Sequence, residues 1–402
     1  MNILILSYFF TPDFSAGSFR TQALINSLSK KDSISNIYIF TSMPNRYSDE
    51  KMILPKRFED IDYNGKKIKI FRSLSIQHKN SFFLQIISFL IFLISCFFWS
   101  FRIRDKINII YATSSRFGTA LLGFLLSRIL QVKINLDIRD IFSDSLMVLS
   151  NKNLFLKVIT NSIRKIENYV FKNSDSITYV SNGFYENLSI NNKKNVLYIP
   201  NGIDEQFIRF SSKSDTKDNK PIEPLKITYA GNIGYAQGLH NTIPKLAKIF
   251  NNKLQFDIIG SGNAIAFMKK DIAEMKLKNI KIIKPVNRQQ LINFYRNSDI
   301  LFLQLAEEKA FEKVLPSKIF EYSVFDVPIL AGVAGIAKEF ISNEVENSYT
   351  FPPNNLDKAI NQINLILSNY NYVKRVSFVK KFNRERLMDN LSDFLIKNAD
   401  NE

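Results

Sequence analysis

Histidine and cysteine are scarce in this chain of 402 residues. The single cysteine, Cys96, excludes an intramolecular disulfide and a cysteine-ligated zinc cluster. The two histidines, His78 and His240, are too far apart in the sequence to suggest a local metal site. A Ser-His-Asp hydrolase and a histidine-ligated metalloenzyme are therefore disfavoured.

The sequence predicts neither a secretory leader nor a repeat architecture. Met1 and Asn2 bring no basic segment, and the four apolar residues 3–6 suit a buried strand better than a leader. No short repeat recurs, which argues against a solenoid. We expect a protein that stays in the cytoplasm.

Acidic residues are outnumbered, with 37 Asp and Glu against 54 Lys and Arg, a formal net charge of +17. Nucleic acid, an anionic membrane surface or a phosphorylated substrate would each suit this charge, and A/T-rich codon usage, indicated by the 35 Phe and the many Lys, Asn and Ile, explains part of it. No RNP, zinc-finger or helix-turn-helix signature accompanies the charge, so we expect no nucleic-acid partner.

Short apolar runs alternate with helical patterns along the whole chain, which predicts parallel sheets covered by helices on both faces. The expected strands are residues 2–6, 37–41, 67–71, 107–112 and 133–137, then 225–229, 254–259, 280–284, 300–305 and 328–331. A polar stretch at 211–224 resembles a linker or long surface loop. The sequence thus predicts an α/β protein with two doubly wound, Rossmann-like domains facing across a cleft, with ligands at the carboxyl ends of the strands.

Residues 82–101 form a run of 20 residues without a charge, long enough to span a membrane. The run lies between two expected strands of one sheet, and basic residues flank both ends, so a span is disfavoured. Three interpretations stay open: a fully buried crossover helix, a partly exposed one that dips into a membrane interface, and a true span.

Three segments carry candidate binding residues. The first strand-to-helix turn contains Gly17, and the turn after residue 229 contains three glycines with Asn232 and Gln237 between strand and helix. The third segment, residues 311–322, reads FEKVLPSKIFEY and predicts a helix that begins at Ser317, with Lys318 in its first turn and Glu321 one turn on. A plain turn at Gly17 and a surface pair between Lys318 and Glu321 are the simpler alternatives.

These segments, with 200–204, 229–239 and 328–330, resemble in their order family 4 glycosyltransferases of the GT-B fold. The closest resemblance is to the WbuB-like amino-sugar transferases of O-antigen and capsule synthesis, because residues 137–142 resemble that branch's RDxxP-type stretch, with Ser143 where proline is usual. The resemblance covers nearly the whole chain, and Leu315 to Tyr322 is its most specific part.

The resemblance implies an acceptor-binding domain at 1–203, a nucleotide-sugar-binding domain at 204–380 and a C-terminal helix at 381–402 that packs back on the first domain. It implies a retaining transfer without a metal or cofactor, from a UDP-linked donor that carries an N-acetylated 6-deoxy amino sugar. The acceptor is a saccharide on a polyprenyl diphosphate. The implied location is cytoplasmic, peripheral or monotopic on the anionic inner face of the plasma membrane.

Residue roles follow from the same resemblance. Glu321 matches the carboxylate that holds the ribose, whereas Lys313 replaces the family's other glutamate, so the adjacent Glu312 becomes the candidate for the donor sugar. Asn232 and Gln237 stand where the family has an arginine and a lysine, which leaves Lys318 to meet the diphosphate charge. The remaining candidates are Gly17, Gly231, Leu315, Pro316 and Ser317 around the donor, Val286 near the base, and Arg139 and Asp140 at the reaction centre.

Asp140 is a candidate base, although a carboxylate that caps a strand end is an equally simple interpretation. Two other functions stay open. A nucleotide-sugar 2-epimerase shares the architecture but usually needs histidines, which are scarce here. A membrane-associated scaffold with a decayed site is suggested by Lys313, Asn232 and Gln237.

Overall fold

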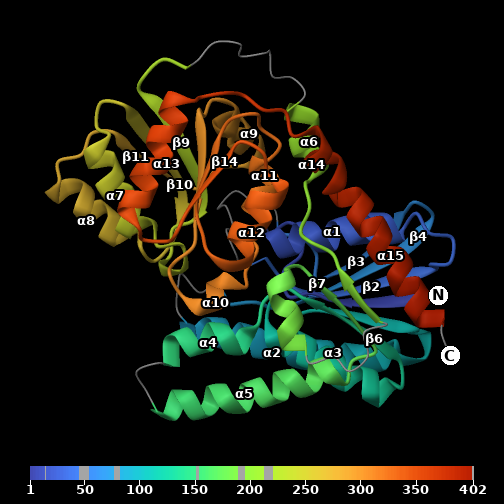
Figure 1. The fold of residues 1–402 in the computed structure, drawn as a ribbon. Helices are drawn as coiled ribbons and strands as arrows, with labels where there is room; N and C mark the ends of the chain where they lie inside the picture. The colour runs from blue at the N-terminus through green and yellow to red at the C-terminus, as the bar shows by residue number, and fades with distance from the viewer. Residues whose placement is uncertain are drawn as a thin grey trace. The chain divides into compact units, whose positions relative to one another are not determined.

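The computed structural model describes residues 1–13, 15–44, 54–76, 82–150, 154–188, 195–211 and 221–400. These residues form two compact units, the first made of Met1–Asn201 with Arg384–Glu402 and the second of Gly202–Asn383 (Figure 1). The boundary expected at residues 203 and 204 lies two residues from this division. Most of the expected linker, residues 212–220, lies outside the described residues, as does His78.

Eight strands form the sheet of the first unit, in the order β3-β4-β2-β1-β5-β6-β7-β8. The strand bounds are β1 Asn2–Leu6, β2 Asn36–Ser42, β3 Phe58–Tyr63, β4 Lys66–Ser73, β5 Ile109–Thr113, β6 Lys133–Ile138, β7 Ser176–Tyr179 and β8 Val196–Tyr198. The central strand β1 pairs in parallel with β2 and β5, so that Leu4 lies opposite Tyr38 and Ile110. The five strands predicted here are confirmed, with ends shifted by at most two residues.

The expectation of a wholly parallel sheet is wrong at one edge. Strand β3 pairs antiparallel with β4, and Asn64 and Gly65 join them with φ angles of 53° and 72°. Such angles are typical of a two-residue hairpin turn, in which Asn-Gly is strongly favoured. The Asn64-Gly65 pair was therefore the signal from which this strand could have been predicted.

Helices cover both faces of the first sheet. Their bounds are α1 Ala16–Leu28, α2 Phe82–Arg102, α3 Phe117–Leu130, α4 Phe142–Ser150, α5 Leu154–Lys172 and α15 Arg384–Asp400. The last of these, α15, runs alongside α1 (Figure 1). Its Leu387, Met388, Leu391 and Leu395 join the buried cluster formed by α1 and the strands β1, β2 and β4. The C-terminal helix is thus part of the core of the first unit.

The second unit contains a six-stranded parallel sheet in the order β11-β10-β9-β12-β13-β14. The strand bounds are β9 Leu225–Asn232, β10 Leu254–Ser261, β11 Ile280–Ile283, β12 Ile300–Gln304, β13 Ile329–Gly332 and β14 Ser348–Phe351. The helix bounds are α6 Glu205–Ser211, α7 Leu239–Ile249, α8 Ile265–Glu274, α9 Arg288–Arg296, α10 Lys309–Glu312, α11 Lys318–Tyr322, α12 Gly335–Glu344, α13 Leu356–Ser368 and α14 Val376–Lys381. Buried clusters line both faces of this sheet. The predicted strands are confirmed, and only β14 was not foreseen.

The uncharged run at 82–101 forms helix α2, which connects β4 to β5 in the first unit. One side of the helix is buried, with Phe92 and Cys96 fully enclosed and Trp99 against Phe40 and Phe71. The opposite side is exposed to solvent. Across the most apolar 18 residues of the helix, 28% is buried. The interpretation of a fully buried helix is therefore wrong.

Candidate functional site

The carboxyl end of β9 is where the predicted residues of the second unit converge. Gly231 lies there with a φ of 148°, directly opposite Gly260 in the pairing of β9 with β10. A Cβ on Gly260 would overlap the carbonyl oxygen of Gly231, so both glycines allow a close approach of two backbones. The Gly-Ser-Gly stretch at 260–262 thus has a packing role in the turn beside the candidate site.

Lys318 reaches this strand end from α11. Its ammonium lies 5.7 Å from the centre of the Tyr229 ring, and a Cβ on Gly231 would overlap Nζ and Cε of Lys318. The Tyr229 hydroxyl in turn donates to the carbonyl oxygen of Asn232 at 2.6 Å. The structure therefore brings together Gly231 and Lys318, two positions 87 residues apart in the sequence, and places positive charge over the strand end. We call Gly231, Lys318, Tyr229, Asn232 and Gln237 the β9 site.

Asn232 and Gln237, the residues at the two positions where basic side chains were missing, are hydrogen-bonded to each other. The Asn232 amide donates to Oε1 of Gln237 at 2.9 Å, and the same oxygen accepts from the Gly234 backbone N–H at 3.3 Å. This pair orders the loop after β9 without adding charge. It supports the expectation that the cation of this site comes from Lys318.

Gln304 holds this loop from a neighbouring strand, and the sequence analysis missed it. It ends β12, and its Nε2 donates to the carbonyl oxygens of Gln237 and Gly238 at 3.3 and 3.0 Å. Its Oε1 is buried and has no hydrogen-bond partner among the described residues. A glutamine at the carboxyl end of an otherwise apolar strand was the signal that could have found it.

The segment 309–322 consists of the short helix α10, a turn and helix α11. Helix α11 begins at Lys318 with Ser317 as its N-cap, one residue from the predicted start, while Leu315 is buried and Pro316 half-buried. Glu321 is half-buried beside Tyr322, whose hydroxyl accepts from the Ala230 backbone N–H at 3.3 Å. Burial raises the pKa of Tyr322, and the charge of Glu321 adds to the rise. Glu321 therefore belongs to a helix that is anchored next to the β9 site.

Two other predicted donor residues, Glu312 and Val286, lie elsewhere in the chain of the second unit. The side chain of Glu312 is exposed, and its backbone carbonyl packs against Gly335 at the start of α12. Val286 follows β11, which β10 separates from β9, and its side chain packs against the apolar core of the second unit. These contacts place Glu312 beside the start of α12 and Val286 against the core of the second unit.

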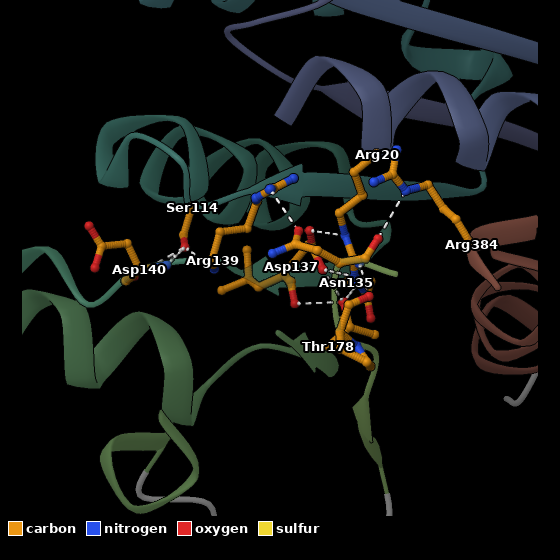
Figure 2. A network of polar contacts seen from close by, with 11 residues as sticks. Arg20, Ser114, Asn135, Asp137, Arg139, Asp140, Thr178 and Arg384 are labelled. Carbon is orange, nitrogen blue, oxygen red and sulfur yellow. Dashed lines mark hydrogen bonds and ion pairs between the residues drawn. The ribbon is translucent and has the colours of Figure 1, made fainter. Parts of the chain in front are cut away.

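Figure 2 shows a polar network in the first unit that connects β6 with its neighbours. At its centre, the Asp137 carboxylate accepts from Nε and Nη2 of Arg20 at 3.0 and 2.9 Å, and from the Thr178 hydroxyl at 2.9 Å. The pKa of Asp137 is lowered. Burial by itself would raise this pKa, but the positive charges of the Arg20 and Arg139 guanidiniums outweigh the effect of burial. The sequence analysis did not identify Arg20, whose only signal was a basic residue within an apolar helix pattern.

Arg139 approaches the same carboxylate from the end of β6. Its Nη2 donates to the Asn201 side chain at 3.1 Å, and Arg384 donates to the Asn201 carbonyl at 3.0 Å. The Nη1 atom of Arg139 is buried, has no hydrogen-bond partner among the described residues, and lies 3.9 Å from where a Cβ on Gly17 would be. Burial lowers the pKa of Arg139, and Asp137 offsets only part of that effect. A buried donor that points at the start of α1 is suited to an anion.

Asp140 lies one residue farther along, at the surface of the first unit. Its carboxylate accepts from the Ser145 hydroxyl at 3.3 Å, and its backbone N–H and carbonyl both contact the Ser114 hydroxyl. The protein that surrounds the carboxylate desolvates it and raises its pKa to about 6, with a smaller contribution from Glu167. Gly17, Arg139 and Asp140 are thus brought close to one end of the first sheet.

The structure also bears on metal binding. Among the described ranges, no group of three or more His, Cys, Asp or Glu side chains is placed to hold a metal ion.

Comparisons with known proteins agree with this geometry. The family model described as "Glycosyl transferases group 1" matches residues 210–382, most of the second unit. A sucrose-phosphate synthase from Thermosynechococcus elongatus superposes with a TM-score of 0.71 at 13% identity, over 99% of this chain and 98% of that one. The fold is GT-B. HepE of Anabaena, solved in complex with UDP-glucose, gives a TM-score of 0.64 at 14% identity, over 99% of this chain and all of that one.

A curated relative is the putative colanic acid biosynthesis glycosyl transferase WcaI of Escherichia coli (strain K12). It is 26% identical over 215 residues, which are 48% of this chain and 50% of the relative. The alignment therefore spans about half the length of each protein. The family match places the similarity to group 1 glycosyl transferases in the second unit.

Proposed function

We propose that the protein is a glycosyltransferase that moves a sugar from a UDP-linked donor to a saccharide on a polyprenyl diphosphate. The observation that carries this proposal is the match of residues 210–382 to group 1 glycosyl transferases, in a unit whose β9 site carries positive charge beside a glycine turn. HepE, which shares the fold, is described in complex with UDP and UDP-glucose. WcaI, a relative by sequence, is named as a putative glycosyl transferase of colanic acid biosynthesis.

The proposed donor site lies in the second unit. Lys318 neutralises the diphosphate near Gly231, and Glu321 accepts hydrogen bonds from the ribose hydroxyls. The loop held by Asn232 and Gln237 contributes backbone N–H groups, and the turn formed by Leu315, Pro316 and Ser317 positions α11. Because the nucleotide sugar is a substrate, the reaction needs no cofactor.

The proposed chemistry is a transfer with retention of configuration. The bond between the anomeric carbon and the β-phosphate oxygen breaks, and the acceptor oxygen bonds to the same face of that carbon. Negative charge grows on the departing diphosphate, so a fixed cation stabilises the transition state more than the ground state. The acceptor proton passes to the leaving diphosphate. Arg139 and Asp140 of the first unit line the reaction centre, where Arg139 meets an anionic group.

The finer donor assignment, an N-acetylated 6-deoxy amino sugar, rests on the resemblance of residues 137–142 to WbuB-like enzymes. A thermal-shift screen of UDP-sugars should show the largest stabilisation with that class, because a ligand that binds only the folded state raises the melting temperature. A larger shift with UDP-glucose or UDP-galactose would refute the amino-sugar assignment and leave the transfer reaction in place.

The decisive experiment for the reaction is product analysis with a polyprenyl-diphosphate-linked saccharide, in buffer that contains EDTA. Formation of a longer lipid-linked saccharide with the donor configuration kept supports the proposal. Conversion of the UDP-sugar to its 2-epimer in the absence of acceptor would instead show an epimerase. A folded protein that does not bind UDP in calorimetry would show a scaffold.

A further inference from the structure

Helix α2 exposes a continuous apolar side. The exposed positions recur every three to four residues along it, which is the spacing of one helix face. Phe83, Leu90, Ile94 and Phe98 are each between 50% and 68% exposed. The other side packs on the sheet and on α3, where the Phe89 ring lies so close to Gly118 that a Cβ there would overlap it. An apolar surface of this kind on the solvent side of a helix is typical of a site that binds a membrane or another protein.

Two neighbouring helices extend the apolar side. Helix α3 contacts both α2 and α5, and these helices lie together on one side of the first unit's sheet in Figure 1. Leu125 and Ile129 of α3 are about half exposed, and Leu154 and Val158 near the start of α5 are 80% and 59% exposed. Tyr169 of α5 is also exposed, at 62%. We call the exposed side chains of α2, α3 and α5 the three-helix face.

The exposed charges on these helices have one sign. They carry six basic residues, Arg102, Arg128, Lys157, Arg164, Lys165 and Lys172. Their single acidic residue, Glu167, is 1% exposed, and its carboxylate accepts from the backbone N–H groups of Phe142 and Ser143. The solvent side therefore combines apolar side chains with mainly positive charge, and two acidic residues outside these helices pair with it, Asp144 with Arg164 and Asp175 with Arg128.

We propose that the three-helix face docks the protein onto an anionic lipid bilayer, with α2 lying in the interface. Apolar rings and branched chains enter the acyl boundary, while lysines and arginines among them meet anionic headgroups. A second copy of the chain is disfavoured as the occupant, because a symmetric contact would bring the same basic residues together. A span is disfavoured because one side of α2 forms part of the core of the first unit.

This inference goes beyond the transfer reaction and does not depend on it. The test is flotation of the full chain with vesicles of phosphatidylcholine, alone or with phosphatidylglycerol added. The apolar variant replaces Leu90, Ile94 and Phe98 with serine. Its matched control replaces the equally exposed Ile249, Leu365 and Val376 of the second unit with serine.

We expect the apolar variant to lose at least about tenfold in vesicle binding, from the apolar area that no longer leaves water, and its control to bind as the unchanged protein does. Replacing Lys157, Lys165 and Lys172 with alanine should lower binding to the anionic vesicles by about fivefold per lysine and leave binding to neutral vesicles unchanged. The control for charge replaces Lys245, Lys248 and Lys253 of the second unit with alanine.

A second measurement avoids dependence on the stability of the serine variant. Because Cys96 is buried, a cysteine introduced by Phe98→Cys is the accessible thiol for an environment-sensitive dye. The dye should shift to the blue on anionic vesicles, whereas the same dye on Val376→Cys should not.

Three outcomes would overturn the proposal: undiminished vesicle binding of the apolar variant, an unshifted dye at position 98, or a stable dimer that the apolar variant dissociates without any binding to lipid. Labelling of Phe83→Cys and Arg102→Cys from opposite sides of a sealed vesicle would replace docking by a span. Calorimetry with UDP reads the β9 site separately, so failure here leaves the transfer reaction standing.

Discussion

Replacing Arg20 or Arg139 with glutamine should separate stability from catalysis, although both guanidiniums lie beside the same carboxylate. Arg20 makes two hydrogen bonds to Asp137 and a third to the Pro200 carbonyl, all within buried surroundings. Arg20→Gln leaves the buried Asp137 charge without its main partner. Removal of one member of a buried ion pair typically costs about 3–5 kcal/mol.

Arg139→Gln has a different balance. It removes one hydrogen bond to Asn201, worth about 1 kcal/mol, and it also removes a desolvated charge whose burial is unfavourable. We expect the free energy of unfolding to change by no more than about 1 kcal/mol. If the buried Nη1 atom binds an anionic group of the substrate, kcat/KM should fall by about 10- to 100-fold, the value of one charge-assisted hydrogen bond.

Urea unfolding, UDP calorimetry and initial rates with the lipid-linked acceptor measure the three quantities. The pKa of Asp137 is lowered in the folded state, so the stabilisation by its ion pair is complete above the unfolded value of about 3.9 and is lost as the pH falls through the folded value. The stability difference between Arg20→Gln and the unchanged protein should therefore shrink in acid. The reasoning is refuted if Arg139→Gln unfolds as easily as Arg20→Gln, or if it keeps full kcat/KM.

Three further outcomes are expected. Glu321→Gln should weaken UDP binding by about tenfold or more in calorimetry, whereas the control Glu339→Gln, which changes an exposed carboxylate on α12, should leave the UDP affinity unchanged. Equal affinities for the two variants would show that Glu321 does not bind the ribose. Lys318→Ala should lower kcat more than UDP affinity, because the charge on the leaving group grows in the transition state. Gly231→Ala should reproduce the loss, because its Cβ would displace the Lys318 ammonium. Loss of activity in Lys313→Ala with full activity in Lys318→Ala would show that the phosphate cation is misassigned. If Asp140 acts as a base, kcat/KM should decrease as the pH falls below about 6, and Asp140→Asn should remove this pH dependence. Because the pKa of Asp140 is raised in the folded state, Asp140→Asn should also be more stable than the unchanged protein above that pH. An unaltered pH profile of kcat/KM would show that Asp140 only caps the end of the strand.

The β9 site was largely predictable from the sequence because local patterns define it. A strand followed by glycines, and a proline followed by the start of a helix, place Gly231 and Lys318 at ends of their elements. What the pattern could not give is the contact between them, since Lys318 reaches Gly231 only through the pairing of β9, β12 and β13. The amide pair of Asn232 and Gln237 was likewise visible as a missing charge but not as a hydrogen bond.

The network around Asp137 was not predictable in the same way. Arg20 and Asp137 are 117 residues apart and both lie within runs that read as apolar core. A buried ion pair leaves no periodic signal, because each member alone looks like an isolated polar residue on a covered element. Only the order of the strands, with β1 next to β5 and β5 next to β6, brings α1 over the end of β6.

Helix α2 shows why hydropathy alone could not choose among the three interpretations of its sequence. Hydropathy reports the average along the helix, and that average is high whether one side or both sides are covered. The distinction is made by neighbours: Phe92, Cys96 and Trp99 are enclosed by the sheet and α3, whereas Phe98 is open to solvent. Solvent exposure of such an apolar side is unfavourable in water, and the basic residues beside it on α3 and α5 favour an anionic lipid surface as its partner. A protein whose proposed acceptor is anchored in a membrane would use that cover to bring its first unit to the surface where the acceptor lies.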